Sequence, residues 1–277
     1  NVTHHHKIMS TLVMGILNVT PDSFADGGRH YSIDAAITRA DEMIAEGVDI
    51  IDVGGESTKP GAERVTEAEE LSRVIPVITE LVKKNVAISI DTTRAAVAKK
   101  AIDLGVNYVN DVSGGLADPK MYRTIAENPT AQYIIMHWRA HSKEMQELAK
   151  YTDVVKEVKE EIEARIESAI EVGVSPEQII IDPGLGFSKL PEHNWELLRN
   201  IERLALLGYP ILIGASRKRF LGELTGATNP DEREAASIAI TAMVAKLDVW
   251  GVRTHSVKPH RDAIATVNSF AKSKVQG

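Results

Sequence analysis

The feature that most constrains the fold of this chain is a regular alternation of short apolar segments with longer amphipathic ones. Eight short segments are rich in β-branched residues, and most are apolar throughout, as expected for parallel strands that are buried on both faces. We therefore predict strands at residues 12–18, 49–53, 86–91, 108–111, 132–137, 179–182, 210–215 and 251–255.

The segments between the predicted strands have the periodicity of helices. Thr66 and Glu69 have the spacing of a capping box and predict a helix over residues 67–84. Apolar residues recur every three or four positions from residue 154 to residue 170 and predict one long helix that ends at Gly173. We expect eight strands and eight helices to alternate along the chain.

Strict alternation of eight β and α units, with no linker between them, predicts a single (β/α)₈ TIM barrel, class α/β, over residues 10–277. An open, doubly wound sheet also fits the alternation, but eight units without a break in composition favour the closed barrel. The connections over residues 18–31 and 54–65 are long for this fold and contain Gly and Pro. We therefore expect two binding loops or lids at the active face.

Composition excludes several classes of function. The 277 residues include 39 acidic residues and 32 Lys or Arg residues, a net charge of −7 that argues against a nucleic-acid partner. No apolar run reaches the roughly 18 residues that a membrane span requires, which argues against a membrane protein. The absence of cysteine excludes disulfides, thiolate catalysis and Cys-based metal sites.

The start of the chain has its own composition. Residues 1–9 contain three consecutive His residues and lack the apolar stretch of a signal peptide. We interpret these nine residues as a tag remnant or a disordered N-terminus. The lack of an export signal predicts a location in the cytoplasm.

Several common catalytic motifs are missing from the sequence. It contains no Gly-Lys dipeptide of a phosphate-binding loop, no HExxH motif and no GxSxG motif. His137 and His141 have the spacing of two metal ligands on a helix, but the signal for zinc is weak because no acidic third ligand follows nearby.

Polar residues at the ends of the predicted strands are the remaining candidates for a site, because the reactive face of a barrel lies at the carboxyl ends of its strands. Some of them serve only as turn residues or helix caps. Asp91, Asn110 and Asp182 stand apart because they follow apolar runs that place them at the barrel mouth. A buried carboxylate there needs a donor, which a protein cation or a ligand supplies.

These strand ends predict a site with two parts. The first offers both acceptors and a donor, which suits a flat heterocycle with an N–H edge opposite a carbonyl group. Its residues are Asp91, Asn110, Asp182 and Lys218. The second is a cationic group that suits phosphate oxygens. Its residues are Arg217, Arg253 and His255.

Seven motifs occur in the chain in an order that is typical of one enzyme family. They read MGILNVTPDSFADGG, DVGGESTKPGA, SIDT, NDVSGG, DPGLGFSK, GASRKRFLG and VRTHSVK. They extend from Met14 to the last predicted helix, and NVTPDSF, GGEST and SRK are highly specific in combination. On these motifs the chain resembles the dihydropteroate synthases of the folate pathway, a family of (β/α)₈ barrels.

The resemblance implies a transferase reaction. The family condenses 6-hydroxymethyl-7,8-dihydropterin diphosphate with 4-aminobenzoate to give 7,8-dihydropteroate and diphosphate, with Mg²⁺ as cofactor. These two small molecules are the implied partners. The family is a sulfonamide target and its members are usually homodimers, so we expect a homodimer.

The family's site residues transfer to this chain motif by motif. The residues implied to hold the pterin ring are Asp91, Asn110, Asp182 and Lys218. The residues implied to bind the diphosphate are Asn18, Arg253 and His255. Asn18 is also the implied ligand of Mg²⁺, a cation that prefers one or two protein oxygens together with phosphate and water. The implied catalytic residues are Asp91, Lys218, Arg253 and His255.

The resemblance places a second set of residues around 4-aminobenzoate. Phe24, Thr58 and Pro60 belong to the long loops that would close over it, and Phe187 would lie near its ring. Arg219 stands where many members of the family have Ser, close to the aminobenzoate carboxylate. Arg219 either neutralises that carboxylate or points away and leaves this role to the N-terminus of the following helix.

The substrates and residues that the resemblance implies predict a mechanism. We expect positive charge on Arg253 and His255, together with Mg²⁺, to neutralise the leaving diphosphate. The electron-rich pterin can stabilise a cation at its exocyclic methylene carbon, and Asp91 and Asp182 would stabilise that charge. The arylamine is a neutral nucleophile, so no strong base is required.

Two other functions fit part of the sequence. A methyltetrahydrofolate:corrinoid methyltransferase would explain Asp91, Asn110 and Asp182, but not the SRK motif or the predicted anion site. A non-catalytic paralogue that binds pterins would explain the same residues without turnover. Four residues argue against that paralogue: Asn18, Lys218, Arg253 and His255.

Overall fold

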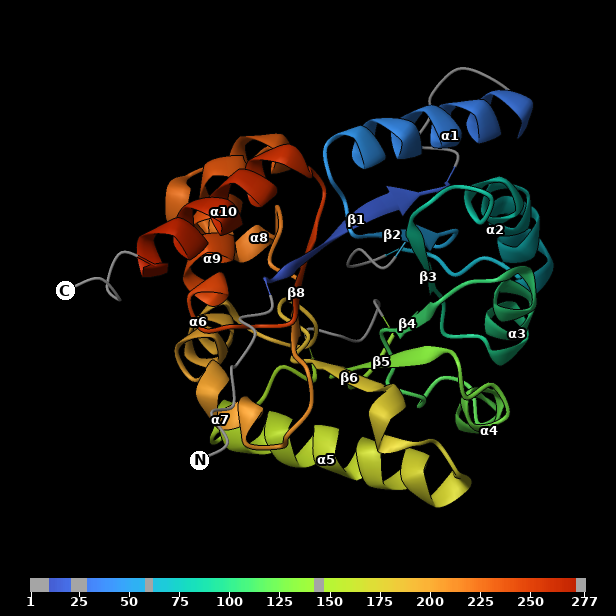
Figure 1. Ribbon diagram of the computed structural model, residues 1–277. Helices are drawn as coiled ribbons and strands as arrows, with labels where there is room; N and C mark the ends of the chain where they lie inside the picture. The colour runs from blue at the N-terminus through green and yellow to red at the C-terminus, as the bar shows by residue number, and fades with distance from the viewer. Residues whose placement is uncertain (1–9, 21–28, 58–61, 142–146, 273–277) are drawn as a thin grey trace, which may run out of the picture.

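Eight parallel strands form one sheet that curves into a barrel in the computed structural model, which describes residues 10–20, 29–57, 62–141 and 147–272 (Figure 1). The strands are β1 (Leu12–Asn18), β2 (Ile50–Gly54), β3 (Ala87–Asp91), β4 (Tyr108–Asp111), β5 (Gln132–Met136), β6 (Ile179–Asp182), β7 (Leu212–Ile213) and β8 (Gly251–Thr254). Their order in the sheet is β6-β5-β4-β3-β2-β1-β8-β7, and a bridge between Ile181 and Ile211 joins its two edges. The predicted (β/α)₈ barrel is confirmed.

The helices surround the barrel, as Figure 1 shows. They are α1 (Arg29–Ala45), α2 (Glu67–Leu81), α3 (Ala95–Leu104), α4 (Met121–Ala126), α5 (Val154–Val172), α6 (Pro191–Arg199), α7 (Ile201–Ala205), α8 (Arg219–Thr225), α9 (Glu234–Ala245) and α10 (Lys258–Lys272). Two helices follow β6 and two follow β7, so the described ranges hold ten α-helices rather than the eight expected.

The predicted helix ends are set by caps. Thr66 accepts a hydrogen bond from the Glu69 backbone N–H at 3.2 Å, so α2 begins as predicted. It ends at Leu81, three residues before the predicted end. Helix α5 ends at Gly173, whose φ of +113° is in the left-handed region that glycine adopts without strain.

The interior of the barrel is apolar toward the amino ends of the strands and polar toward their carboxyl ends. Five buried residues form the apolar layer: Met14, Ile50, Ile134, Ile180 and Leu212. Residues two positions apart on a strand face the same side. Asp52 therefore follows Ile50 on the inner wall, and Asp182 follows Ile180. This alternation directs polar side chains into the barrel mouth.

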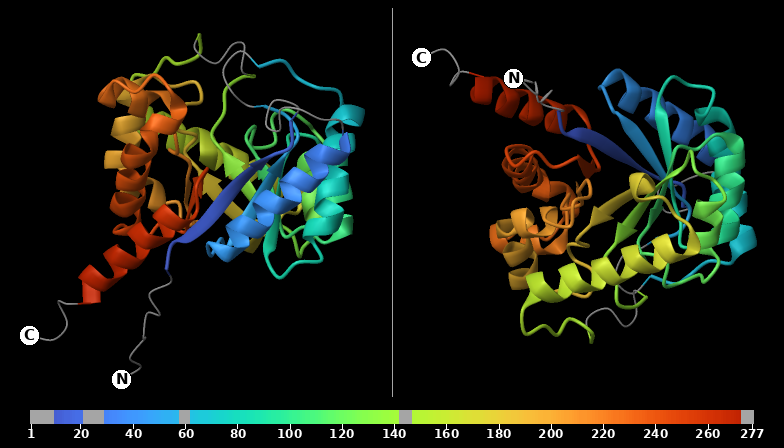
Figure 2. Two further views of the ribbon diagram at one scale, coloured as in Figure 1. Left: turned by 90° about the horizontal axis from the view of Figure 1, so that it is seen from above. Right: turned by 60° about the horizontal axis from the view of Figure 1, so that its bottom comes forward.

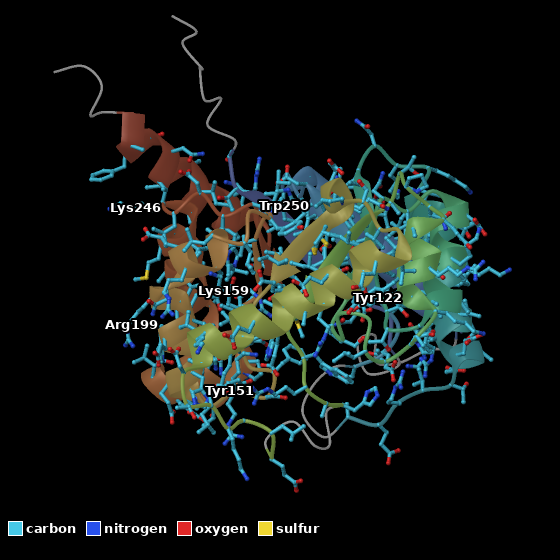
Figure 3. The ribbon with its side chains drawn as sticks, turned by 90° about the horizontal axis from the view of Figure 1, so that it is seen from below. Tyr122, Tyr151, Lys159, Arg199, Lys246 and Trp250 are labelled. Carbon is cyan, nitrogen blue, oxygen red and sulfur yellow. The ribbon has the colours of Figure 1, made fainter. Side chains whose placement is uncertain are left out.

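Helix α10 and Trp250 lie at the amino end of the barrel, and Tyr151 lies at the opposite end. Helix α10 packs beside the start of β1 (Figure 2), where Asn268 Nδ2 donates to Ser10 Oγ at 3.0 Å. Trp250, which precedes β8, lies at this amino end in Figure 3, and Tyr151, which precedes α5, lies at the opposite end. Among the described helices, none is long and apolar enough to span a membrane.

Candidate active site

Four of the predicted site residues lie at or near the carboxyl ends of barrel strands and are brought together at the barrel mouth. Asp91 ends β3, Asn110 lies on β4, Asp182 ends β6 and Arg253 lies on β8. Asp91, Asn110 and Asp182 are only 8%, 3% and 4% exposed, respectively. Because burying a polar group is unfavourable without a partner, this cluster is costly for the fold and needs compensating contacts.

Asp52 lies at the centre of this cluster, although it is not among the residues predicted from the sequence. It is fully buried on β2, and its Oδ2 accepts hydrogen bonds from Asn110 Nδ2 at 3.1 Å and from Arg253 Nε at 2.7 Å. Its Oδ1 has no hydrogen-bond partner among the described residues. The signal in the sequence was a single carboxylate within an otherwise apolar strand.

Arg253 is shared between two carboxylates. Besides its bond to Asp52, its Nη2 donates to Asp91 Oδ2 at 3.1 Å. Burial and, secondly, the negative charge of Asp52 raise the pKa of Asp91 to about 8, although Arg253 opposes this shift. The carboxyl of Asp91 therefore carries a proton through much of the neutral pH range in the ligand-free protein.

Lys218 and Asp182 form the opposite wall. Lys218 Nζ donates to the Leu185 carbonyl at 2.5 Å, and the Gly184 N–H donates to Asp182 Oδ1 at 2.8 Å. A methyl group on Gly214 would lie 3.6 Å from Lys218 Nζ and 4.0 Å from Asp182 Oδ2, so both groups lie over the same glycine. Burial lowers the pKa of Lys218 to about 8, and Asp182 opposes this shift.

Asn18 lies at the rim of the same mouth. It is exposed at the end of β1. A methyl group on Gly54 would lie 3.7 Å from Asn18 Oδ1 and 3.3 Å from Asp91 Oδ2. The amide oxygen of Asn18 and the carboxyl of Asp91 thus flank Gly54, where a larger residue would fill the space between them.

His255 reaches the mouth from the end of β8, but without the predicted charge. Ser216 Oγ lies 3.0 Å from its Nδ1 and accepts its backbone N–H at 3.1 Å. Burial, followed by the positive charges of Arg253 and Arg217, lowers the pKa of His255 to about 3. The imidazole is therefore neutral in the ligand-free protein, and the expectation of a histidine cation is wrong for that state.

Arg217, which was also predicted to belong to the cationic group, forms ion pairs with two carboxylates. Its Nε donates to Glu234 Oε2 at 2.9 Å and its Nη1 to Asp231 Oδ1 at 3.0 Å. Two carboxylates thus compensate its charge. The backbone of Arg217 has a φ of +57°, in the left-handed region, and the residues on either side, Ser216 and Lys218, both contribute to the site.

Of the residues expected around 4-aminobenzoate, Phe187 lies beside Lys218 and Arg219 points away from the site. Phe187 is half-buried in the connection after β6, and Lys218 Nζ lies 5.0 Å from the centre of its ring. Arg219 has a side chain that is 86% exposed and pairs with Glu223 at 3.1 Å, which corresponds to the alternative in which it points away. Phe24, Thr58 and Pro60 lie outside the described residues.

The histidine pair that suggested zinc has other partners. His137 Nε2 lies 3.0 Å from Glu161 Oε2, and its Nδ1 lies 2.8 Å from Lys189 Nζ. His141 Nε2 lies 3.4 Å from Arg64 Nη1. Within the described ranges, no group of three or more His, Asp or Glu side chains is arranged to hold a metal ion.

His137 and His255 are expected to make stability depend on pH. Burial is the main cause that lowers the pKa of each to about 3, below the ordinary 6.5. As the pH falls below 6.5, the unfolded chain binds protons that the folded chain does not, so stability is lost between pH 6.5 and about 3. We expect His255→Gln to reduce the slope of the unfolding free energy against pH by about 1.4 kcal/mol per pH unit in this window.

Urea titrations of both proteins between pH 4 and 6 measure this slope. An unchanged slope in His255→Gln would mean that His255 takes up its proton equally in the folded and unfolded chains.

Comparisons with known proteins agree with these motifs. The sequence profile described as pterin binding enzyme matches residues 14–255. A dihydropteroate synthase of Mycobacterium leprae is 48% identical over 264 residues, which cover 93% of each chain. A crystal structure of a dihydropteroate synthase from Clostridium difficile, in the presence of pteroic acid, has a TM-score of 0.88 at 42% identity, covering 94% of this chain and 97% of that one. One from Xanthomonas albilineans with 4-aminobenzoic acid has a TM-score of 0.89 at 38% identity, covering 95% and 94%.

Proposed function

The chain belongs to the pterin-binding enzyme family and has dihydropteroate synthase activity, and we propose that the buried polar residues at its barrel mouth carry that activity out. The reaction joins 6-hydroxymethyl-7,8-dihydropterin diphosphate to 4-aminobenzoate and releases diphosphate. One observation carries the proposal: Asp91, Asn110, Asp182 and Lys218 come from separate β–α units and meet beside Arg253. The identity to dihydropteroate synthases also favours this function over a corrinoid methyltransferase.

We propose that the pterin ring binds between the two walls of the mouth. Asp91 and Asp182 offer acceptors to the N–H groups of the ring, and Lys218 offers a donor to its carbonyl group. Asn110 is fixed by Asp52 and presents its remaining amide atoms toward the ring. The roles of Asp91, Asn110 and Asp182 rest on the burial of their side chains, because a buried acceptor gains more from a ligand donor than an exposed one.

The proton on Asp91 bears on how the ring is held. In the free site Asp91 is surrounded by Asp52 and low-dielectric protein, so its charge is unfavourable. A bound ring that donates N–H groups and develops positive charge favours the ionised form. We propose that Asp91 releases its proton to water when the pterin binds, and that its carboxylate, together with Asp182, stabilises the pterin cation in the transition state.

Bond changes at the methylene carbon complete the reaction. The carbon–oxygen bond to diphosphate breaks, and its electron pair leaves with the oxygen. The amine nitrogen of 4-aminobenzoate then bonds to that carbon and loses one proton to the released diphosphate or to water. Because the arylamine attacks as a neutral molecule, none of the proposed site residues needs to act as a strong base.

Arg253 and His255 are proposed to bind the diphosphate. Arg253 contributes a permanent charge, whereas His255 enters the reaction neutral. We propose that the Ser216 hydroxyl donates to Nδ1. The imidazole then keeps its proton on Nε2 and donates a hydrogen bond to a phosphate oxygen. The negative charge of a bound diphosphate raises the pKa of His255 again, so the histidine gains charge in step with its ligand.

Asn18, at the rim of the mouth, suits a magnesium ion that is bound mainly by the diphosphate of the substrate. Asn18 contributes one exposed amide oxygen next to Asp91, and the described residues offer no three-ligand cluster. Mg²⁺ usually keeps several waters and is bound by one or two protein oxygens with phosphates. We propose Asn18 as its protein ligand. The chemistry that Mg²⁺ supplies when bound is neutralisation of charge on the diphosphate oxygens.

The site for 4-aminobenzoate is proposed to include Phe187, which lies beside Lys218. Phe24, Thr58 and Pro60 remain proposed members on the basis of the sequence motifs. Sulfonamides are proposed to bind at this same site. Arg219 is not included, because it extends into solvent and pairs with Glu223.

A homodimer is proposed from the exposed apolar residues on one side of the barrel. Leu224 on α8, Met243 on α9 and Phe270 on α10 are each more than half exposed. Figure 1 shows these three helices on the same side of the barrel. Exposed apolar residues on one side are typical of an interface between subunits. The location in the cytoplasm stays a prediction from the sequence.

The roles of Lys218 and Asn18 are tested by measuring diphosphate release and the mass of the product in the presence of both substrates and Mg²⁺. We expect Lys218→Ala to lose turnover by about 100-fold or more, because a half-buried donor to the substrate is removed. EDTA should abolish turnover, and Asn18→Ala should raise the Mg²⁺ concentration for half-maximal rate by about tenfold.

Lys258→Met, which removes an exposed lysine on α10, is the matched control and should keep the wild-type rate. Pterin binding without product by the wild-type protein would indicate the non-catalytic paralogue instead. An unchanged Mg²⁺ requirement in Asn18→Ala would contradict the proposed metal ligand.

A further inference from the structure

Lys189 is a buried lysine for which the proposed mechanism gives no role. It ends the segment of residues 183–189 that follows β6, and it is only 3% exposed. Its Nζ lies 2.8 Å from His137 Nδ1, 2.9 Å from the Gly184 carbonyl and 2.8 Å from the Phe187 carbonyl. A buried ammonium with three acceptors is compensated by hydrogen bonds rather than by direct contact with a carboxylate.

The partners of His137 decide how Lys189 is protonated. Glu161 accepts two hydrogen bonds from Arg139, one from Nε at 3.1 Å and one from Nη2 at 2.9 Å. Its hydrogen bonds from His137 and Arg139 lower the pKa of Glu161 to about 2 against the effect of burial, so it is a carboxylate. His137 must therefore donate from Nε2 to Glu161 and accept at Nδ1.

It follows that all three neighbours of Lys189 Nζ are acceptors. A neutral amine has only two N–H groups, whereas an ammonium has three. Burial lowers the pKa of Lys189, and the negative charge of Asp182 opposes that shift. The three acceptors favour the ammonium, because only the ammonium can donate to all of them.

The segment that Lys189 closes has an unusual backbone conformation. Gly184, Gly186 and Ser188 have φ values of +70°, +81° and +50°, so three alternate residues are left-handed. At Gly184 a methyl group would lie 2.3 Å from the His137 carbonyl, which shows how closely the segment packs on the end of β5. Ser188 has no glycine-like freedom, so contacts elsewhere must maintain its conformation.

The same segment supplies two contacts of the active site. The Leu185 carbonyl accepts the hydrogen bond from Lys218 Nζ, and the Phe187 ring lies 5.0 Å from that nitrogen. Gly184 and Phe187, whose carbonyls bind Lys189, flank Leu185 on both sides. The two lysines therefore hold adjacent carbonyl groups of one short segment.

We propose that Lys189 is a positioning residue for the reaction. Its ammonium holds residues 184–188 in the conformation that presents the Leu185 carbonyl and the Phe187 ring to Lys218. His137, Glu161 and Arg139 fix the ammonium in turn. The inference rests on the proposed function, because it gives Lys189 an effect on the pterin and aminobenzoate sites through Lys218 and Phe187.

The test uses Lys189→Met, which removes the ammonium and retains most of the side-chain volume. Three acceptors then lose their donor, the left-handed segment relaxes, and Lys218 loses its fixed partner. We expect the Kd for 6-hydroxymethylpterin, which carries the ring without the diphosphate, to rise about tenfold or more by calorimetry. The KM for 4-aminobenzoate should rise with it, so that kcat/KM falls about 10- to 100-fold.

Two controls separate positioning from general loss of stability. Lys258→Met makes the same change at an exposed position of α10. Ile166→Ala creates a cavity under α5 and leaves every residue that binds Lys189 unchanged. Both should retain the wild-type Kd for 6-hydroxymethylpterin, although Ile166→Ala unfolds at a lower denaturant concentration.

A spectroscopic measurement tests the charge state directly. In protein with ¹⁵N-labelled lysine, Lys189 Nζ should give a slowly exchanging signal with the shift of an ammonium, and Lys189→Met should lack it. If Lys189→Met does not accumulate as folded protein, Gly184→Ala displaces the same segment from the His137 carbonyl while keeping the ammonium. That variant should show the same loss of pterin affinity.

The proposal would be overturned if Lys189→Met bound 6-hydroxymethylpterin with wild-type affinity. If only Gly184→Ala folds, wild-type affinity in that variant would overturn it. A neutral-amine signal for Lys189 would overturn it as well. Failure of the proposed reaction is distinguishable, because it would appear as a wild-type protein that binds the pterin without forming product.

Discussion

Asp91→Ala is expected to lower turnover by about 10²–10³-fold, the loss that follows removal of a group that stabilises charge in a transition state. Asp91 is 8% exposed and is bound by Arg253, so water cannot replace it easily. Asp91→Asn separates two roles of the carboxylate. The amide keeps an acceptor for the ring but carries no negative charge, so a similar loss in this variant would identify charge stabilisation as the main effect.

The measurement is kcat with saturating substrates, together with the Kd for 6-hydroxymethylpterin. Asp262→Asn, an exposed carboxylate on α10, is the matched control and should have no effect. Near-normal turnover in Asp91→Ala would refute the assignment of this residue to catalysis. Normal turnover in Asp91→Asn alone would restrict Asp91 to recognition of the ring.

Stability should change in the opposite direction from activity in Asp91→Asn. The folded pKa of Asp91 is raised to about 8 from an ordinary 3.8, so ionisation destabilises the fold progressively as the pH rises between these values. The amide does not ionise. Asp91→Asn is therefore expected to be more stable than the wild type above pH 8, as is common for residues kept for function at a cost in stability.

The barrel could be predicted from the sequence because its signals are local and repeated. Apolar strands that are buried on both faces need no knowledge of partners to be recognised, and the ends of those strands must meet at one face. This is why Asp91, Asn110 and Asp182 could be selected correctly for proximity. The extra helices α7 and α8 escaped prediction because they are short and lie within single β–α connections.

Asp52 was missed for a geometrical reason. In this β–α unit the residues predicted for the site, Thr58 and Pro60, come after the strand in sequence, whereas Asp52 lies two positions before the end of β2 at Gly54. Its side chain still points into the mouth, because inner positions recur at every second residue. A carboxylate inside an apolar strand is thus a signal for the site, even when the strand continues beyond it.

The charges of the site depended on contacts that only the fold creates. Arg217 and Arg253 looked equivalent in sequence, yet Glu234 and Asp231 compensate Arg217, while Asp52 and Asp91 hold Arg253 in the mouth. His255 was expected to be charged because its motif suits an anion. Burial beside two guanidinium groups makes it neutral until a ligand arrives.

Arg253→Met is expected to have the second large effect, on both stability and turnover. Asp52 is fully buried and receives its only charged hydrogen bond within the described residues from Arg253. Removing one partner of such a pair leaves an uncompensated carboxylate, which costs about 3–5 kcal/mol of unfolding free energy. Turnover should fall by about 10³-fold, because a cation that stabilises the departing diphosphate is also lost.

The double variant Asp52→Asn, Arg253→Met distinguishes the two effects. At pH 7 the amide that replaces the Asp52 carboxylate needs no cation. Burial, the largest cause that raises the pKa of Asp91, is unchanged in this variant, so Asp91 keeps its proton and no buried charge is left without a partner. Urea titrations should therefore show most of the lost stability restored. Turnover should remain as low as in the single variant, because the diphosphate still lacks its cation. Recovery of turnover together with stability would mean that Arg253 serves only to balance Asp52, and that the negative charge of the leaving group is stabilised elsewhere in the barrel mouth.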